Sequence, residues 1–398
     1  MPGDHTASFA YFTPEMNRIY LDNAATSFPK PPDVWEAVVE QGREVGANAG
    51  RSAYRSAQAT DSVIDETRVL LARLLGGRAD RVILTLNTTD ALNLALKGFV
   101  EPGAHVVTSI MEHNSVRRPL DGLARRSGVR VTTVGADRCG RVSVEDISAV
   151  LEPDTCLVAL MHASNVCGAV QPIEQVGQLC RDRGVKLLVD AAQTAGSLPI
   201  HMVDMGIDLL AVPGHKGLLG PLGTGALLLA DDVDLHVWRE GGTGSSSDEL
   251  EQPAVYPDHL EAGSPNVPGI AGWRAGLRYI ERVGLDSLRG HVERLARQLV
   301  NALDGIPGVE IGGPELPERE AIFPIRVEGY RADELAVVLD AGYAIEVRSG
   351  LHCAPGAHRA LGTLPDGSVR ISPGPFTTEA EIERLVAALS ELASSPPL

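Results

Sequence analysis

Lysine is scarce in this chain of 398 residues. It occurs only at Lys30, Lys97, Lys186 and Lys216, so arginine supplies nearly all of the 35 basic residues, and 52 acidic residues bring the formal net charge to −17. No basic stripe is present, which argues against a nucleic-acid partner, because phosphate binding needs clustered Lys and Arg that release counterions. Any chemistry that needs a lysine amine therefore has four candidates.

Cysteine is also sparse, and long apolar runs are absent. The five cysteines form no C-x-x-C pair and no metal-ligand spacing, which argues against a disulfide-stapled scaffold and a metal site and indicates a reducing compartment. No apolar run reaches the roughly 18 residues that suggest a membrane helix. Residues 1–18 lack the basic start and the apolar stretch of a secretory signal. We therefore expect a cytoplasmic protein with no membrane partner.

The composition and the hydrophobic pattern predict an α/β protein. Apolar residues make up 44% of the chain, which is ample for buried cores, and its length predicts two domains. Apolar runs alternate with amphipathic stretches, which is typical of βαβ units and a mainly parallel sheet. The expected strands cover 81–86, 105–109, 130–134, 156–162, 186–190, 208–212 and 225–229, and helical patterns cover 63–75 and 173–183.

A Gly-, Ser- and Pro-rich stretch at 241–269 predicts loops followed by a domain boundary. Beyond it, a smaller α+β domain is expected, whose last helix starts at the capping box Thr378-x-x-Glu381. Its expected helices lie near 270–282, 285–303 and 332–340, and its strands near 309–311, 321–327 and 344–347. We place the large domain at residues 19–268 and the small domain at residues 1–18 and 269–398.

Two candidate site residues lie at the ends of predicted strands. Lys216 follows the strand 208–212 on a glycine-rich turn, which is where an α/β protein holds a ligand, although a solvated loop lysine fits equally well. Asp190 ends the strand 186–190 and could pair with a cationic ring nitrogen, or cap the next segment. The other lysines look weaker, since Lys30 lies among prolines, Lys97 ends a helix and Lys186 opens a strand.

Further candidates follow other strands. Thr88 and Thr89 open the helix 90–97, so they form a phosphate cradle or a simple N-cap. No G-x-G-x-x-G follows a strand and no P-loop exists, which leaves a dinucleotide or ATP site without support. His113 could present its ring to a planar ligand, or be a structural histidine. Cys353 lies in a Gly/Pro loop near Arg348, surroundings that favour a thiolate, whereas the other four cysteines are expected to be buried structural thiols.

Taken together, these segments resemble the pyridoxal phosphate (PLP) enzymes of the class V aminotransferase family, within it the cysteine desulfurase and selenocysteine lyase branch. The resemblance implies the aspartate aminotransferase-like fold of PLP-dependent transferases. Single motifs are weak, but the ordered set spans nearly the whole chain. The matching stretches are Tyr20–Thr26, Met111–His113, Ser164–Val166, Val189–Gln193, Gly214–Lys216, Glu261–Asn266 and Arg348–Ala354.

The resemblance implies roles for most of the candidates. Lys216 would form the Schiff base with PLP and then act as general base, while Asp190 would pair with the pyridine nitrogen. Gln193 would bond the phenolic oxygen and His113 would stack on the ring. The phosphate ligands would be Thr88, Thr89 and His215, and the residues around the substrate would be Asn165, Arg370, Arg348, Asn23 and, from a neighbouring subunit, Arg51.

The resemblance also implies a reaction. The Cys353 thiolate would attack the sulfur of L-cysteine, leaving a persulfide and L-alanine. The short R-x-G-x-H-C-A loop resembles the branch that hands sulfur to an acceptor protein, as in iron–sulfur cluster assembly, and a homodimer is implied. Two positions depart from the family pattern: Pro213 replaces a Ser or Thr that contacts the phosphate, and Leu351 replaces a second histidine.

Three functions remain open on the sequence alone. The first is a cysteine desulfurase. The second is a related PLP enzyme: a selenocysteine lyase, an aminotransferase or a carbon–sulfur lyase. The third is a non-enzymatic scaffold, for which the best support would be Pro213 disabling the cofactor site.

Overall fold

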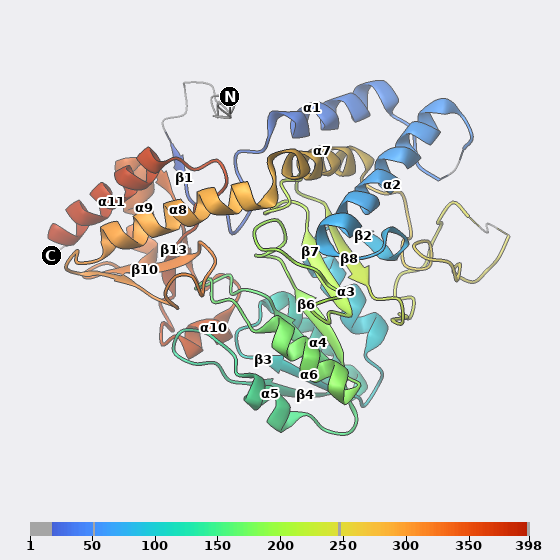
Figure 1. The fold of residues 1–398 in the computed structure, drawn as a ribbon, viewed down its shortest axis with the longest axis horizontal. Coiled ribbons are helices and arrows are strands. Elements are labelled where there is room, and N and C mark those ends of the chain that lie inside the picture. Colours follow the sequence, from blue (N-terminus) through green and yellow to red (C-terminus); the bar gives the residue numbers. More distant parts are fainter. Residues whose placement is uncertain (1–17, 51, 246–247, 396–398) are drawn as a thin grey trace, which may run out of the picture.

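The computed structural model describes residues 18–50, 52–245 and 248–395, and its centre is a seven-stranded sheet (Figure 1). The strand order is β2-β8-β7-β6-β5-β3-β4, and β8 alone runs antiparallel to both of its neighbours. The expected mainly parallel sheet is therefore confirmed. Its strands are β2 (Val82–Thr85), β3 (His105–Ser109), β4 (Arg130–Val134), β5 (Thr155–Met161), β6 (Lys186–Asp190), β7 (Leu209–Pro213) and β8 (Gly225–Leu229).

Helices cover both faces of this sheet because its strands are apolar on both sides. In β6, for example, Leu187 and Val189 face one buried cluster, and Leu188 between them faces another, as the two-residue period of a strand requires. The first cluster also takes side chains from α2 (Arg55–Leu75), α6 (Ile173–Arg183) and α7 (Val267–Val283). The second takes them from α3 (Thr88–Phe99) and α4 (Asn114–Ser127).

A smaller antiparallel sheet of order β12-β13-β10-β9 forms the other part of the molecule (Figure 1). Its core takes side chains from the long α8 (Leu285–Leu303) and from α11 (Glu379–Ser394), which begins at the expected capping box on Thr378. The remaining elements of this part are β9 (Val309–Ile311), β10 (Phe323–Val327), α9 (Ala332–Tyr343), β11 (Ile345–Glu346), β12 (Arg348–Gly350), α10 (Pro355–Ala360) and β13 (Ser368–Ile371).

The buried clusters cross the predicted domain limits at two places. The short β1 (Ile19–Tyr20) pairs in parallel with β11, and Ile19 and Leu21 pack in the core of the smaller sheet. Conversely, α7 packs its buried Trp273 into the core of the large sheet, beside α1 (Pro32–Glu40) and α2. The division into two domains stays a proposal. If it holds, β1 packs with the smaller domain and α7 packs with the larger one.

Within residues 18–50, 52–245 and 248–395, no helix has the length and apolar character needed to cross a membrane. In the same residues, no three His, Cys, Asp or Glu side chains gather in a way that could hold a metal ion.

Candidate active site

A pocket of about 720 Å³ opens at the carboxyl ends of the central parallel strands, the position where open α/β sheets bind ligands. Its lining comes from the segments that follow β2, β3, β5, β6 and β7, and from β12 and β13 of the smaller sheet. The pocket brings together ten of the residues predicted from the sequence: Thr88, Thr89, His113, Asn165, Asp190, Gln193, His215, Lys216, Arg348 and Arg370.

Lys216 and Asp190 are the lysine and the aspartate of the pocket, and each influences the pKa of the other. Burial lowers the pKa of Lys216 to about 8, with Asp190 opposing the shift and the cations Arg370 and Arg348 adding to it. Burial likewise raises the pKa of the Asp190 carboxyl, against the hydrogen bond that its Oδ1 accepts from the Ala192 N–H at 2.9 Å and against Lys216. The amine therefore loses its proton far more readily than an ordinary lysine does, which favours its nucleophilic form.

His113 stands at the start of α4 with its ring orientation fixed. Its Nδ1 accepts from the Ser115 N–H at 3.1 Å and lies 2.7 Å from Ser115 Oγ, which leaves the ring proton on Nε2. Ser115 Oγ lies 2.8 Å from Thr89 Oγ1, so it joins His113 to the start of α3. Burial, together with the positive charge of Lys216, lowers the pKa of His113 to about 4. The ring is thus neutral at physiological pH and offers an aromatic face.

The start of α3 lines the pocket beside His215. The N-cap is Asn87, whose side chain accepts from the Asp90 N–H at 2.9 Å, and not a threonine as one sequence alternative had it. The first N–H groups of a helix have no intrahelical acceptor and carry the positive end of its dipole. Thr88 and Thr89 line the pocket together with His215, whose pKa burial lowers to about 4.

Arg370 is the buried cation on the opposite wall, only 1% exposed. Its Nη2 donates to Asp22 Oδ1 at 2.5 Å and its Nη1 to the Asn165 carbonyl at 3.0 Å. Its Nε and the side-chain oxygen of Asn165 are buried without a partner among the described residues. A carboxylate is the complement that an arginine fork of this kind binds best.

Cys353 is exposed at the edge of this wall, on a loop with unusual backbone geometry. His352 and Cys353 both have left-handed backbones, with φ of 47° and 59°, a conformation that costs about 1–2 kcal/mol for such residues. The loop is held where the Asn114 N–H donates to the Cys353 carbonyl at 2.9 Å. Arg348 Nη2 lies 3.8 Å from Cys353 Sγ, so a guanidinium is in place to partner a thiolate.

The residues of this pocket fit PLP. An aldehyde requires a lysine amine, a pyridine nitrogen a carboxylate, an aromatic ring a flat neutral face such as imidazole, and a phosphate a helix N-terminus. The pocket offers each of these groups. Three buried polar atoms of the pocket have no protein partner among the described residues and are therefore available to a ligand: His215 Nδ1, Asn165 Oδ1 and Arg370 Nε. Pro213 ends β7 and does not line the pocket.

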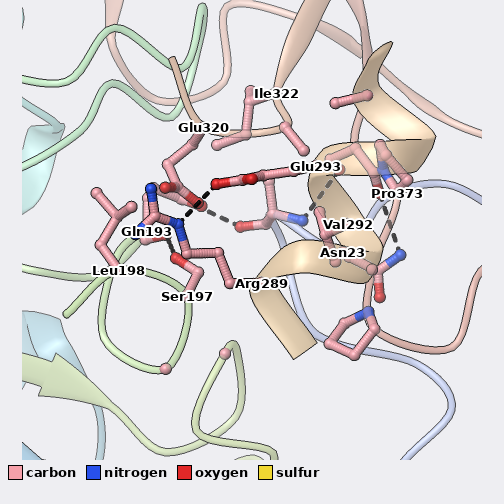
Figure 2. Close-up of a pocket in the computed structure, with 18 of the residues that line it drawn as sticks. Asn23, Gln193, Ser197, Leu198, Arg289, Val292, Glu293, Glu320, Ile322 and Pro373 are labelled. Atoms are coloured by element: carbon pink, nitrogen blue, oxygen red, sulfur yellow. Dashed lines mark hydrogen bonds and ion pairs between the residues drawn. The ribbon is translucent and has the colours of Figure 1, made fainter. Parts of the chain in front are cut away.

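A second cavity of about 940 Å³ lies on the other side of Lys216 and Gln193. Figure 2 shows Glu320, Arg289 and Ser197 close together along one side of it, with Asn23 and Pro373 on the other. Arg289 Nε donates to Glu293 at 2.7 Å, and burial raises the pKa of Glu320 to about 7. Arg289 is thus paired with Glu293, and Arg319 donates to the Pro314 and Ile322 carbonyls, so we assign no ligand to this cavity.

Some expectations from the sequence have a different outcome. Asn23 lines the second cavity, and its amide donates to the Ser372 carbonyl at 3.1 Å. Arg51 lies outside the described residues. Cys139, expected to be a buried thiol, is exposed on a turn, whereas Cys167 and Cys180 are buried as predicted.

Sequence reasoning also missed members of the site. Ser115, Asn87 and His352 line the pocket, and Asp22 pairs with Arg370. Ser115, two residues after His113 at a helix start, had a usable local signal. Asn87, directly before Thr88 and Thr89, had the same kind of signal, because asparagine is a preferred N-cap residue. The pairing of Asp22 with Arg370 had none, because it depends on contacts between distant segments.

The chain is similar in sequence and in fold to known proteins. The family model described as aminotransferase class-V matches residues 19–385. A probable cysteine desulfurase of Methanothermobacter thermautotrophicus is 34% identical, with 95% of each chain covered. The apo structure of a cysteine desulfurase from Thermococcus onnurineus superposes with a TM-score of 0.89 at 31% identity, over 95% of each chain. For the Escherichia coli cysteine desulfurase CsdA the TM-score is 0.85 at 26% identity, over 96% of each chain.

Proposed function

The chain belongs to the aminotransferase class-V family, and from that membership we propose that it is a PLP-dependent cysteine desulfurase. Relatives over nearly its full length carry that activity in their names. The observation that carries the proposal is one pocket that holds the buried Lys216 amine, Asp190 and the Arg370 fork, with the exposed Cys353 thiol beside Arg348 at its edge.

Substrate binding falls to the wall opposite Asp190. Arg370 would hold the carboxylate of L-cysteine, because a buried guanidinium presents donors to a planar anion. Asn165 would assist with its second amide N–H, since the first donates to the His352 carbonyl at 2.7 Å. Asp22 holds the guanidinium in place from the other side. This arrangement would direct the substrate's sulfur toward the edge of the pocket where Cys353 lies.

Proton transfer falls to Lys216. When bound, PLP supplies an electron sink that stabilises negative charge at the α-carbon of the substrate. Lys216 Nζ would remove the α-proton and later return a proton, a role suited to an amine whose pKa is lowered to about 8. Asp190 would keep the cofactor nitrogen protonated. His113, fixed by Ser115, would cover the ring face, and Thr88, Thr89 and His215 would hold the phosphate.

Sulfur transfer falls to Cys353. Its thiolate would attack the substrate's sulfur, so that an S–S bond forms as the C–S bond breaks and the C–S electron pair stays on carbon. Protonation of that carbon gives L-alanine, and Cys353 is left as a persulfide. Atoms and electrons balance without an external oxidant: L-cysteine and a thiol yield L-alanine and a persulfide.

The test is turnover of L-cysteine by the purified protein with a reductant, with alanine and sulfide both quantified. We expect a yellow protein that loses its colour in Lys216→Ala, and sulfide release that collapses in Cys353→Ala. The matched control is Cys139→Ala, which removes another exposed thiol and should leave the rate unchanged. Full activity of Cys353→Ala on cysteine would refute the assignment of the nucleophile. If Cys353→Ala kept selenide release from selenocysteine but lost sulfide release from cysteine, the result would point to a selenocysteine lyase.

Three further proposals concern the sulfur acceptor, the oligomeric state and the cellular location. We propose that the persulfide passes to an acceptor protein, as in iron–sulfur cluster assembly, since Cys353 is exposed on an ordered loop. We also propose a homodimer in which Arg51 reaches the neighbouring site. A cytoplasmic location would agree with the five cysteines, none of which forms a disulfide.

A further inference from the structure

We propose that Lys30 is a positioning residue for Lys216: its buried amine holds the carbonyl oxygen of His215 and so fixes the peptide that carries the catalytic lysine. The inference rests on the proposed function, since it assigns a new residue to the same site. Lys30 lies in the loop before α1, about 185 residues away from Lys216 in the sequence.

The contacts of Lys30 are short and enclosed. Its side chain is only 6% exposed, and its Nζ lies 2.7 Å from the His215 carbonyl oxygen and 2.6 Å from Ser27 Oγ. No carboxylate forms an ion pair with Lys30 among the residues that the structure describes. Of the two acceptors of this buried amine, the His215 carbonyl belongs to the loop that carries Lys216. The other, Ser27 Oγ, belongs to the segment that contacts this loop.

Neighbouring groups act on the same peptide. The His215 carbonyl also accepts from Thr26 Oγ1 at 3.0 Å and from the Ser27 N–H at 3.1 Å. The Lys216 carbonyl accepts from Ser27 Oγ at 2.9 Å. The two carbonyls flank the Cα of Lys216, so residues 26–30 hold its backbone on both sides.

The lysine loop needs this support because its own sequence is not stiff. Gly214 and Gly217 flank the His-Lys pair, and glycine places little restriction on the backbone. Pro213 before them has no N–H to donate. A catalytic amine must be placed within a fraction of an ångström of its productive position. The loop has internal bonds, from the Leu219 N–H to the Lys216 carbonyl at 2.9 Å and from the Gly220 N–H to the Gly214 carbonyl at 2.7 Å, but neither involves the His215 carbonyl. The donors of residues 26–30 supply the constraint at that carbonyl.

The protonation of Lys30 is compatible with this role. Burial lowers the pKa of Lys30 to about 7. The ammonium has three donors and the neutral amine has two, and there are two acceptors, so the contact persists in either form. In its charged form, Lys30 also lowers the pKa of His215, in the same direction as burial does.

The first experiment compares Lys30→Met with the matched control Lys97→Met, which removes a lysine stacked on Trp238 in another part of the large sheet domain. For Lys30→Met we expect kcat for cysteine to fall about tenfold or more with KM within about twofold, as the loss of a buried hydrogen bond to a charged group predicts. The cofactor should also be lost faster on dialysis. Lys97→Met should change neither. Unchanged kcat and cofactor retention in Lys30→Met would overturn the proposal.

A double-mutant cycle separates positioning from a general structural role. Thr26→Val removes another donor to the His215 carbonyl, so its effect on kcat and that of Lys30→Met should be non-additive. Effects that simply multiply, with thermal midpoints falling in parallel, would contradict an action through that carbonyl.

A last measurement does not depend on the proposed reaction. In the cofactor-free full chain, acetylation of Lys216 by acetic anhydride, followed by mass spectrometry, reports how tightly its amine is held. Lys30→Met should speed this labelling and Lys97→Met should not. If the wild-type protein neither bound PLP nor released sulfide, the proposed function would fail. If Lys216 were labelled at the same rate in Lys30→Met and in the wild type, only the role of Lys30 would be rejected.

Discussion

Burial sets the protonation of the side chains around the pocket. It lowers the pKa of Lys216 to about 8 and the pKa values of His113 and His215 to about 4. Near neutral pH the pocket therefore holds neutral imidazoles and a lysine amine that gives up its proton readily. One residue beside His113, Glu112, shows the same effect in the opposite direction, and its titration is measurable in the stability of the fold.

Glu112 should make the protein less stable as the pH rises. It is fully buried, its Oε1 accepts from Ser109 Oγ at 2.6 Å, and burial raises its pKa from 4.5 to about 8. The folded state thus binds more protons than the unfolded state between these pH values. Its contribution is complete below pH 4.5 and is lost as the pH rises through about 8.

The test of this prediction is Glu112→Gln, which stays neutral and keeps an acceptor for Ser109. The free energy of unfolding of the wild type should fall relative to the variant by up to about 1.4 kcal/mol per pH unit in that window. Urea denaturation of both proteins across the window measures the difference. Parallel pH profiles would show that Glu112 is already ionised in the fold.

Helix and loop ends determine where the chemistry of the site lies. The start of α3 supplies the anion cradle, and Asn87 defines that start by capping the Asp90 N–H. On the other side of the pocket, β12 and the left-handed pair His352 and Cys353 set the position of the thiol. Each element places a functional group through its end and not through its middle.

Asn87→Ala should therefore affect both stability and the cofactor. Loss of the N-cap should cost about 1 kcal/mol of stability and loosen the phosphate cradle, so that PLP dissociates faster. The control is Thr378→Ala at the N-cap of α11, where Thr378 accepts from the Glu381 N–H far from the pocket. It should cost a similar free energy with no effect on PLP. Urea denaturation and the rate of cofactor loss measure the two effects, and equal cofactor loss in both variants would contradict the role of α3.

At the scale of the whole molecule, Arg370 joins three parts of the chain. It lies on β13 of the smaller sheet, donates to Asp22 near the N-terminus and donates to Asn165 after β5 of the large sheet. The Lys30 contact is a second such junction, between the N-terminal segment and the loop after β7. The site is complete only when these distant segments pack together.

Asp22→Asn should weaken both the fold and substrate binding. It leaves a buried guanidinium without its counter-charge, which should cost at least about 2 kcal/mol and raise KM for cysteine. Glu346→Gln is the control, because Glu346 pairs with Arg18 at a half-exposed position. Such a pair should contribute less than about 1 kcal/mol. Urea denaturation and steady-state kinetics test both variants, and a wild-type KM in Asp22→Asn would show that Asp22 does not position Arg370.

The sequence by itself determined the elements and most of the chemistry. The strands β3, β4, β6 and β8 run over the predicted residues, because apolar period and turn residues are local properties. The strand-end positions of Asp190 and Lys216 followed from the same pattern, and the family resemblance added their roles.

Only the tertiary structure decided which residues are buried and what they contact. Lys30 looked like a loop lysine among prolines, yet it is enclosed against a carbonyl 185 positions along the chain. Cys139 is exposed although its sequence neighbourhood suggested burial, and β8 is antiparallel within an otherwise parallel sheet. The physical reason is the same in each case: periodicity is encoded over a few residues, whereas burial and pairing arise when segments far apart in sequence pack together.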